Sequence, residues 1–89
     1  MGENLINSRR SELEILADIL RLSKEGAKKT KILYQVNLSY SQLKNYLTFL
    51  KERNFLDEIY LEDGGRIYKT SERGLELLQN IDKLFSYLR

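Results

Sequence analysis

The 89-residue sequence predicts a mainly α-helical fold with one small β-hairpin, which places it in the α+β class. Several segments repeat apolar residues every three or four positions, which is the spacing of one helix face. Ahead of the last of these segments, two short alternating runs flank Asp-Gly-Gly, a sequence that favours a tight hairpin turn. The length and the 42% hydrophobic content are those of one domain with a modest core.

Ser8 or Ser11 is expected to cap the first helix, and Glu14, three residues after Ser11, fits a capping-box pattern. The helix is expected to run to about Glu25 and to stop at Gly26, with residues 1–10 as a flexible lead-in. Its apolar residues cover roughly 220° of the circumference, which is wider than the stripe of an ordinary surface helix. So wide a face indicates either burial within the domain or contact with a second subunit.

A short second helix is expected at Lys31–Val36, capped by Thr30 and preceded by an extended link at Ala27–Lys29. Asn37 tolerates a positive φ angle and suits the turn that follows this helix. With the next helix, which is expected to begin after Ser39, these segments have the outline of a helix-turn-helix.

The third helix is longer and amphipathic. Ser39 and Gln42 form a second capping-box pattern at its start, and Asn54 is a suitable C-terminal cap for a helix that ends near Arg53. Its inner, apolar stripe comprises Leu43, Tyr46, Leu47 and Leu50.

Two strands are expected at Phe55–Glu62 and Arg66–Thr70, joined by a turn at Asp63–Gly65. The order helix, helix, helix, hairpin is that of a winged helix, in which the hairpin forms a wing beside the third, recognition helix. The winged-helix domain is therefore expected to occupy residues 11–70, followed by a dimerisation helix at 71–89.

The last helix, capped by Thr70 or Ser71, carries an apolar seam with the 3-4-3 spacing of a coiled coil. The seam and the residues that widen it are Leu77, Leu78, Ile81, Leu84, Phe85 and Leu88. We expect this seam to form a homodimer, because the winged domain is complete before the helix begins. The alternative is that the helix folds back over the first helix within one chain.

Positive charge is concentrated in the helix-turn-helix, although the net charge of the chain is only +2. Residues 26–55 carry six basic side chains and one acidic one, whereas residues 56–65 carry four acidic and no basic ones. Local charge of this kind attracts a polyanion. The chain has neither Cys nor His, and it lacks phosphate-binding Gly loops, so we expect neither an enzyme nor a metal or cofactor site.

Two motifs resemble the small crenarchaeal winged-helix DNA-binding proteins of about 10 kDa. One is the run from Lys28 to Leu50, most specifically at residues 37–40 and 42–44, and the other is Tyr68–Gly74. The resemblance covers about residues 11–89 and implies a winged helix that binds double-stranded DNA as a dimer. It also implies an antiparallel coiled coil of the C-terminal helices, although this helix is shorter here than in the chromatin-like members.

DNA contacts are expected from three places. Lysines at the start of the second helix would bind backbone phosphates, and the outer face of the recognition helix would enter the major groove, where Gln42 and Asn45 carry amides able to read adenine. Basic residues of the wing would add minor-groove or phosphate contacts, but its acidic outgoing strand leaves wing contact open. The expected set is Lys28, Lys29, Lys31, Ser39, Tyr40, Ser41, Gln42, Lys44, Asn45, Thr48, Lys51, Arg66 and Lys69.

The predicted function is therefore that of a dimeric double-stranded DNA-binding protein acting as a transcription regulator. One alternative is a nucleoid-type architectural DNA binder, and another is a winged helix used as a protein-interaction module, which the acidic hairpin favours. The expected location is cytoplasmic and nucleoid-associated, in an archaeal cell or the host of an archaeal virus or plasmid. Neither a membrane nor a small-molecule substrate is expected as a partner.

Overall fold

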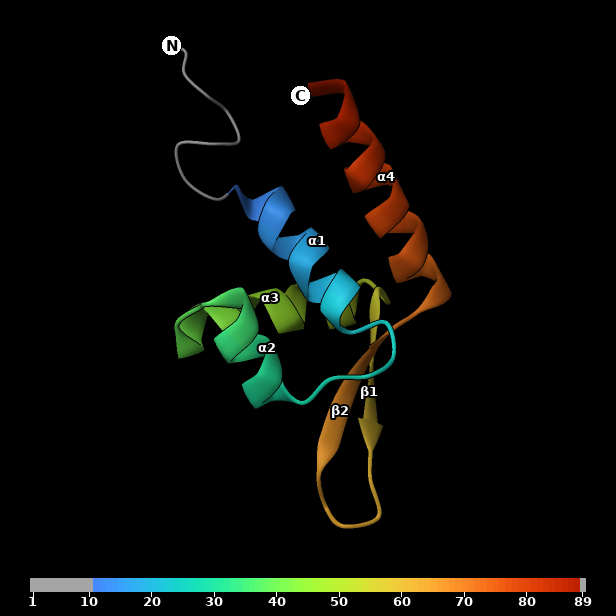
Figure 1. The fold of residues 1–89 in the computed structure, drawn as a ribbon. Helices are drawn as coiled ribbons and strands as arrows, with labels where there is room; N and C mark the ends of the chain where they lie inside the picture. The colour runs from blue at the N-terminus through green and yellow to red at the C-terminus, as the bar shows by residue number, and fades with distance from the viewer. Residues whose placement is uncertain (1–10, 89) are drawn as a thin grey trace.

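The computed structural model describes residues 11–88, whose arrangement Figure 1 shows. In chain order the elements are α1 (Glu12–Leu22), α2 (Lys29–Val36), α3 (Tyr40–Glu52), β1 (Leu56–Tyr60), β2 (Arg66–Thr70) and α4 (Glu72–Leu88). α1 lies beside α4 and α2, α3 packs against α2 and β1, and the antiparallel hairpin extends away from the helices (Figure 1). The predicted α+β winged helix is confirmed, and every element contributes to one hydrophobic core.

The lead-in predicted for residues 1–10, and with it the alternative cap Ser8, lies outside the described residues. Within the part of the chain that the structure describes, no helix is both long and apolar enough to cross a membrane.

Both predicted capping boxes are present. The backbone N–H of Glu14 donates to the Ser11 hydroxyl over 3.1 Å, and the Ser11 N–H donates to the Glu14 carboxylate over 3.1 Å. Ser39 and Gln42 make the same reciprocal pair at the start of α3, at 3.2 and 2.9 Å. Asn37, at the end of α2, adopts the predicted positive φ, at 62°. Arg53 is the C-cap residue of α3, and Asn54, predicted as its cap, follows with a φ of 64°. These bonds satisfy backbone groups that a helix end leaves unpaired.

The end of α1 differs from the prediction. The helix ends at Leu22 rather than near Glu25, because the next carbonyl, that of Ser23, accepts hydrogen bonds from outside the helix. The backbone N–H of Gly26 donates to it over 3.0 Å, and that of Thr70 in β2 donates over 2.9 Å. Contact with the hairpin therefore replaces the last expected turn of helix.

The start of α2 also differs. Ala27 pairs with Tyr68 of β2 through two backbone hydrogen bonds of 2.8 and 2.9 Å, so this link is attached to the hairpin. α2 then begins directly after Lys28, two residues earlier than the predicted start at Lys31. The prediction that Thr30 caps the helix was wrong, because Thr30 lies within its first turn and the N-cap residue Lys28 makes no side-chain capping bond.

β1 is shorter than the predicted strand at residues 55–62. At its start, the Phe55 N–H closes the end of α3 by donating to the Leu50 carbonyl over 2.8 Å. At its end, the Leu61 N–H donates to the Gly65 carbonyl over 2.7 Å and closes the hairpin turn. Both ends of the predicted strand are therefore used by neighbouring turns.

Ser71 is the residue that caps α4. Its hydroxyl accepts the backbone N–H of Gly74 over 3.0 Å, as an N-cap does three residues into a helix. Thr70, the other candidate, is buried, and its hydroxyl donates instead to the Leu20 carbonyl in α1 over 2.6 Å. The end of the hairpin is thus attached to α1 at the point where α4 begins.

The apolar seam predicted on α4 is divided in the structure. Leu78, Ile81 and Phe85 are buried in the core of one chain, where α4 lies along α1. The fold-back arrangement thus holds for these three residues, because the wide apolar face of α1 covers them. Leu84 and Leu88 lie beside this buried stripe and remain 43% and 53% exposed.

Candidate nucleic-acid interface

A lysine-rich surface surrounds the start of α2. Residues 26–51 contain five lysines and no acidic residue, and the side chains of Lys28 and Lys31 are exposed. Lys29 extends toward the start of α3, where its ammonium nitrogen lies 3.5 Å from the Tyr40 hydroxyl and 5.3 Å from the centre of its ring. The helix N-terminus and its lysines together form a surface suited to phosphate groups.

The outward residues of α3 fall on two sides of the helix. Tyr40 contacts α2, and Lys51 contacts β1, so these two define the side that faces the lysine-rich surface and the wing. Lys44 lies two turns before Lys51 and shares this side, because seven residues complete nearly two turns. Ser41 and Thr48 are exposed on the adjoining outer face.

Gln42 and Asn45 lie on the opposite side of α3, toward α1. They line a hollow of about 370 Å³ together with Glu12, Leu16, Tyr46 and Phe49. The Gln42 amide oxygen is also occupied, because it accepts the Ser39 backbone N–H over 2.9 Å. The two amides predicted to read adenine are therefore separated from the lysines of α2, and the capping bond fixes the orientation of the Gln42 amide while leaving one lone pair of its oxygen and its N–H donors for other partners.

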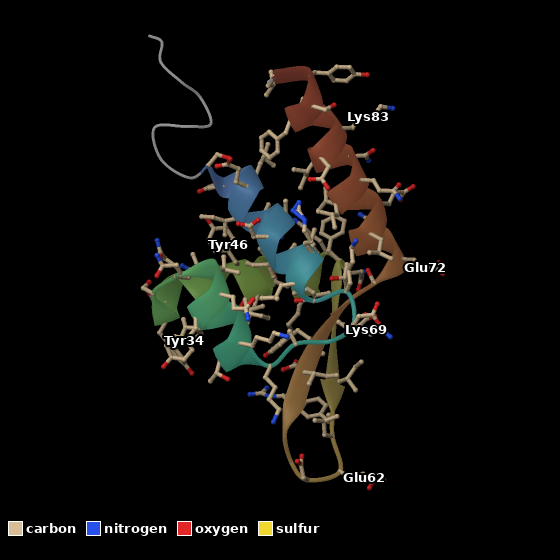
Figure 2. The ribbon with its side chains drawn as sticks, viewed as in Figure 1. Tyr34, Tyr46, Glu62, Lys69, Glu72 and Lys83 are labelled. Carbon is tan, nitrogen blue, oxygen red and sulfur yellow. The ribbon has the colours of Figure 1, made fainter. Side chains whose placement is uncertain are left out.

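The hairpin divides its two predicted DNA contacts between opposite faces. Arg66 shares a face with Tyr68, which points into the core. Lys69 lies on the other face, directly across the strand pair from Asp57. Figure 2 shows the Lys69 side chain directed away from α2 and Glu62 at the tip of the hairpin. The structure thus does not bring Arg66 and Lys69 together.

A residue absent from the predicted contacts, Glu58 of β1, connects the wing to α3. Its two carboxylate oxygens contact the Lys51 ammonium at 2.8 Å and the Arg66 guanidinium at 2.7 Å, and the Tyr68 hydroxyl donates to it over 3.1 Å. The hydrogen bond from Lys51 holds the pKa of Glu58 below its ordinary value and raises the pKa of Lys51. The only sequence signal for this site is the alternation of the strand, which places Glu58 and Tyr60 on one face. That alternation does not show that Lys51, Arg66 and Tyr68 contact Glu58.

The comparison with known families agrees with this architecture. Residues 9–88 match the winged helix-turn-helix family. The chain belongs to that family. This winged helix-turn-helix protein is 32% identical over 78 residues to the uncharacterized protein MJ0290 of Methanocaldococcus jannaschii, a match that covers 86% of this chain. It spans only 35% of the length of that relative.

Solved structures share the winged helix-turn-helix fold. Sso10a-2, a DNA-binding protein from Sulfolobus solfataricus, superposes with a TM-score of 0.78 at 28% identity, covering 88% of this chain and 81% of that one. A mutant of MepR from S. aureus bound to an oligodeoxyribonucleotide gives a TM-score of 0.72 at 12% identity, covering 91% and 61%. The similarity to MepR concerns the fold alone. The similarity to Sso10a-2 confirms the resemblance to the small crenarchaeal proteins.

Proposed function

We propose that this protein binds double-stranded DNA as a homodimer and acts as a transcription regulator, with α3 in the major groove. The observation that carries the proposal is the group of lysines at the start of α2 and on the adjoining side of α3, in a stretch, residues 26–51, that includes no acidic side chain. A winged helix presents this surface to DNA. The similarity to Sso10a-2, which is described as a DNA-binding protein, supports the same function.

The contacts have different roles in this proposal. Lys28, Lys29 and Lys31 neutralise phosphates, while Ser41, Lys44 and Thr48 meet base edges or phosphates within the groove. The proposed set of DNA-contacting residues is completed by Ser39, Tyr40, Gln42, Asn45, Lys51, Arg66 and Lys69.

Phosphate contacts are tested by the salt dependence of binding to a mixed-sequence duplex, measured by fluorescence anisotropy between about 50 and 200 mM salt. Lys28→Ala should weaken binding to every duplex and reduce the slope of log K against log salt by about 1. Lys83→Ala removes the same charge from α4, away from α2 (Figure 2), and should leave binding unchanged. A flat salt response, or equal effects of the two variants, would refute the proposed surface.

The homodimer is proposed to form through one flank of α4, on which Leu84 and Leu88 are exposed and Leu77 is half-buried against the core. Leu77, Leu84 and Leu88 are seven and four residues apart, which places them on one side of the helix next to the buried stripe. A second copy of this flank would remove these leucines from water. Leu84→Glu together with Leu88→Glu should yield monomers in sedimentation experiments, whereas Lys83→Glu on the outer side of α4 should not. A wild-type protein that sediments as a monomer at all concentrations rejects the homodimer.

A second candidate function is that of an architectural, nucleoid-type DNA binder. It is favoured by the position of Gln42 and Asn45 in the hollow beside α1, which leaves hydroxyls and lysines on the remaining surface of α3. Selection of duplexes from a random pool at two salt concentrations separates the candidates. Enrichment of a palindrome indicates a regulator, binding without enrichment indicates an architectural protein, and absence of binding indicates a protein-interaction module.

A further inference from the structure

The two strands of the hairpin contain two acidic residues, Asp57 and Glu58. Asp57 is exposed, whereas Glu58 is mostly covered, with a side chain 12% exposed. Its neighbours in β1 alternate in direction, so Asp57 faces outward while Glu58 faces the end of α3. Both oxygens of Glu58 are engaged, one by Lys51 and the other by Arg66 and Tyr68. A carboxylate with three donors around it stays in place and stays charged near neutral pH.

The two cations held by Glu58 remain within reach of a ligand. The side chains of Lys51 and Arg66 are 39% and 45% exposed, so only part of each contacts the carboxylate. One lies at the end of the recognition helix and the other on the wing, which are the two elements that would flank a DNA backbone. The group of two cations and one carboxylate presents a net charge of +1 to a phosphate, where the cations alone would present +2.

We propose that Glu58 is a positioning residue that competes with DNA phosphate for Lys51 and Arg66 and thereby limits the affinity and the salt dependence of DNA binding. The inference rests on the proposed DNA-binding function. Its physical basis is that Glu58 is fixed and mostly covered, whereas the Lys51 and Arg66 side chains are 39% and 45% exposed and can turn toward a ligand, so a phosphate and the Glu58 carboxylate are alternative partners for the same cations.

Glu58→Gln tests the inference, because the amide keeps the shape of the side chain and can still accept a hydrogen bond from Tyr68. In anisotropy titrations on a mixed-sequence duplex, E58Q should bind about threefold to tenfold more tightly at low salt, with a slope of log K against log salt steeper by about 1. Asp57→Asn is the matched control, since it removes one negative charge from the outer face of the same strand and should give a smaller gain.

The double variant identifies the cation involved. In an Arg66→Gln background, Glu58→Gln should gain less than it does in the wild-type protein, because one of the released cations is missing. Equal gains in both backgrounds, or a gain from Asp57→Asn as large as that from Glu58→Gln, overturn the inference. Weaker binding by E58Q also overturns it, since that result assigns Glu58 a role in supporting the DNA-bound geometry.

The outcomes separate this inference from the proposed function. Wild-type protein that binds DNA, with no gain in E58Q, refutes the inference alone. Absence of binding by both proteins refutes the proposed function, and the inference falls with it. Circular dichroism establishes that E58Q is folded. If it is not, Arg66→Gln provides the test: its loss of affinity should be smaller than that of Lys28→Ala, and an equal loss overturns the inference.

Discussion

Replacing Phe85 by Ala tests where the apolar stripe of α4 is buried. Phe85 is 4% exposed within a single chain, so its truncation leaves a cavity beside α1. Removal of a buried Phe side chain costs about 3–5 kcal/mol. A domain of 89 residues has a free energy of unfolding of about 4–13 kcal/mol, so the variant loses a large part of its stability. Leu84, the preceding residue, is 43% exposed, and Leu84→Ala should cost less than about 1 kcal/mol in the isolated chain.

Urea unfolding followed by circular dichroism measures both costs, and the experiment should be run at a low and a high protein concentration. Phe85→Ala should lower the free energy of unfolding far more than Leu84→Ala at the low concentration. The cost of Leu84→Ala should rise with concentration if Leu84 lies in the proposed dimer interface, because dissociation adds to unfolding. Equal costs for the two variants at low concentration would show that Phe85 is not covered by its own chain, and the reasoning from burial would fail.

Four further changes have defined outcomes. Gly74→Ala should destabilise the protein by about 3 kcal/mol in urea unfolding, because the added methyl group overlaps the Phe55 carbonyl oxygen. Ser23→Ala should stabilise it by about 1 kcal/mol in the same assay, since the Ser23 hydroxyl is fully buried and has no hydrogen-bond partner among residues 11–88. Ser39→Ala should cost about 1 kcal/mol through loss of the cap of α3, with matching weaker protection of its first turn in hydrogen exchange. Glu58 has a lowered pKa, so its charge stabilises the fold above the ordinary glutamate pKa, and the stability difference between wild type and Glu58→Gln should shrink as the pH falls below about 5.

Local signals in the sequence predicted the starts of α1 and α3 because those starts are determined by neighbouring residues. The capping boxes of Ser11 with Glu14 and of Ser39 with Gln42 involve residues three positions apart, and both occur as predicted. Asn54 likewise has the backbone conformation that its position after α3 requires. In each case the energy that decides the structure comes from contacts within one turn of the chain.

Contacts between distant residues decided the features that sequence reasoning did not predict. The end of α1 depends on the hydrogen bond from the Thr70 backbone N–H to the Ser23 carbonyl, and these two residues are 47 positions apart in the sequence. The site around Glu58 depends on how α3 meets the hairpin, and no spacing within the sequence specifies that approach. The sequence was equally ambiguous for α4. Its apolar spacing suits a seam between two chains as well as a face that packs against α1 within one chain. Only the position of α1 in space shows that Phe85 is covered within the chain.

The capping role of Gln42 bears on how much sequence specificity this recognition helix can provide. A bidentate amide contact to adenine contributes about 1–3 kcal/mol of discrimination. Gln42 holds its amide oxygen on the Ser39 N–H, but that oxygen has a second lone pair, and the amide hydrogens take no part in this bond. A base contact therefore does not require the capping bond to break, but the bond fixes the amide on the α1 side of α3, beside the hollow that Gln42 and Asn45 line. Readout of adenine by Gln42 requires DNA to reach that side of α3, whereas Ser41, Lys44 and Thr48 lie on its other exposed faces. The random-pool selection distinguishes a sequence preference from binding through phosphates alone.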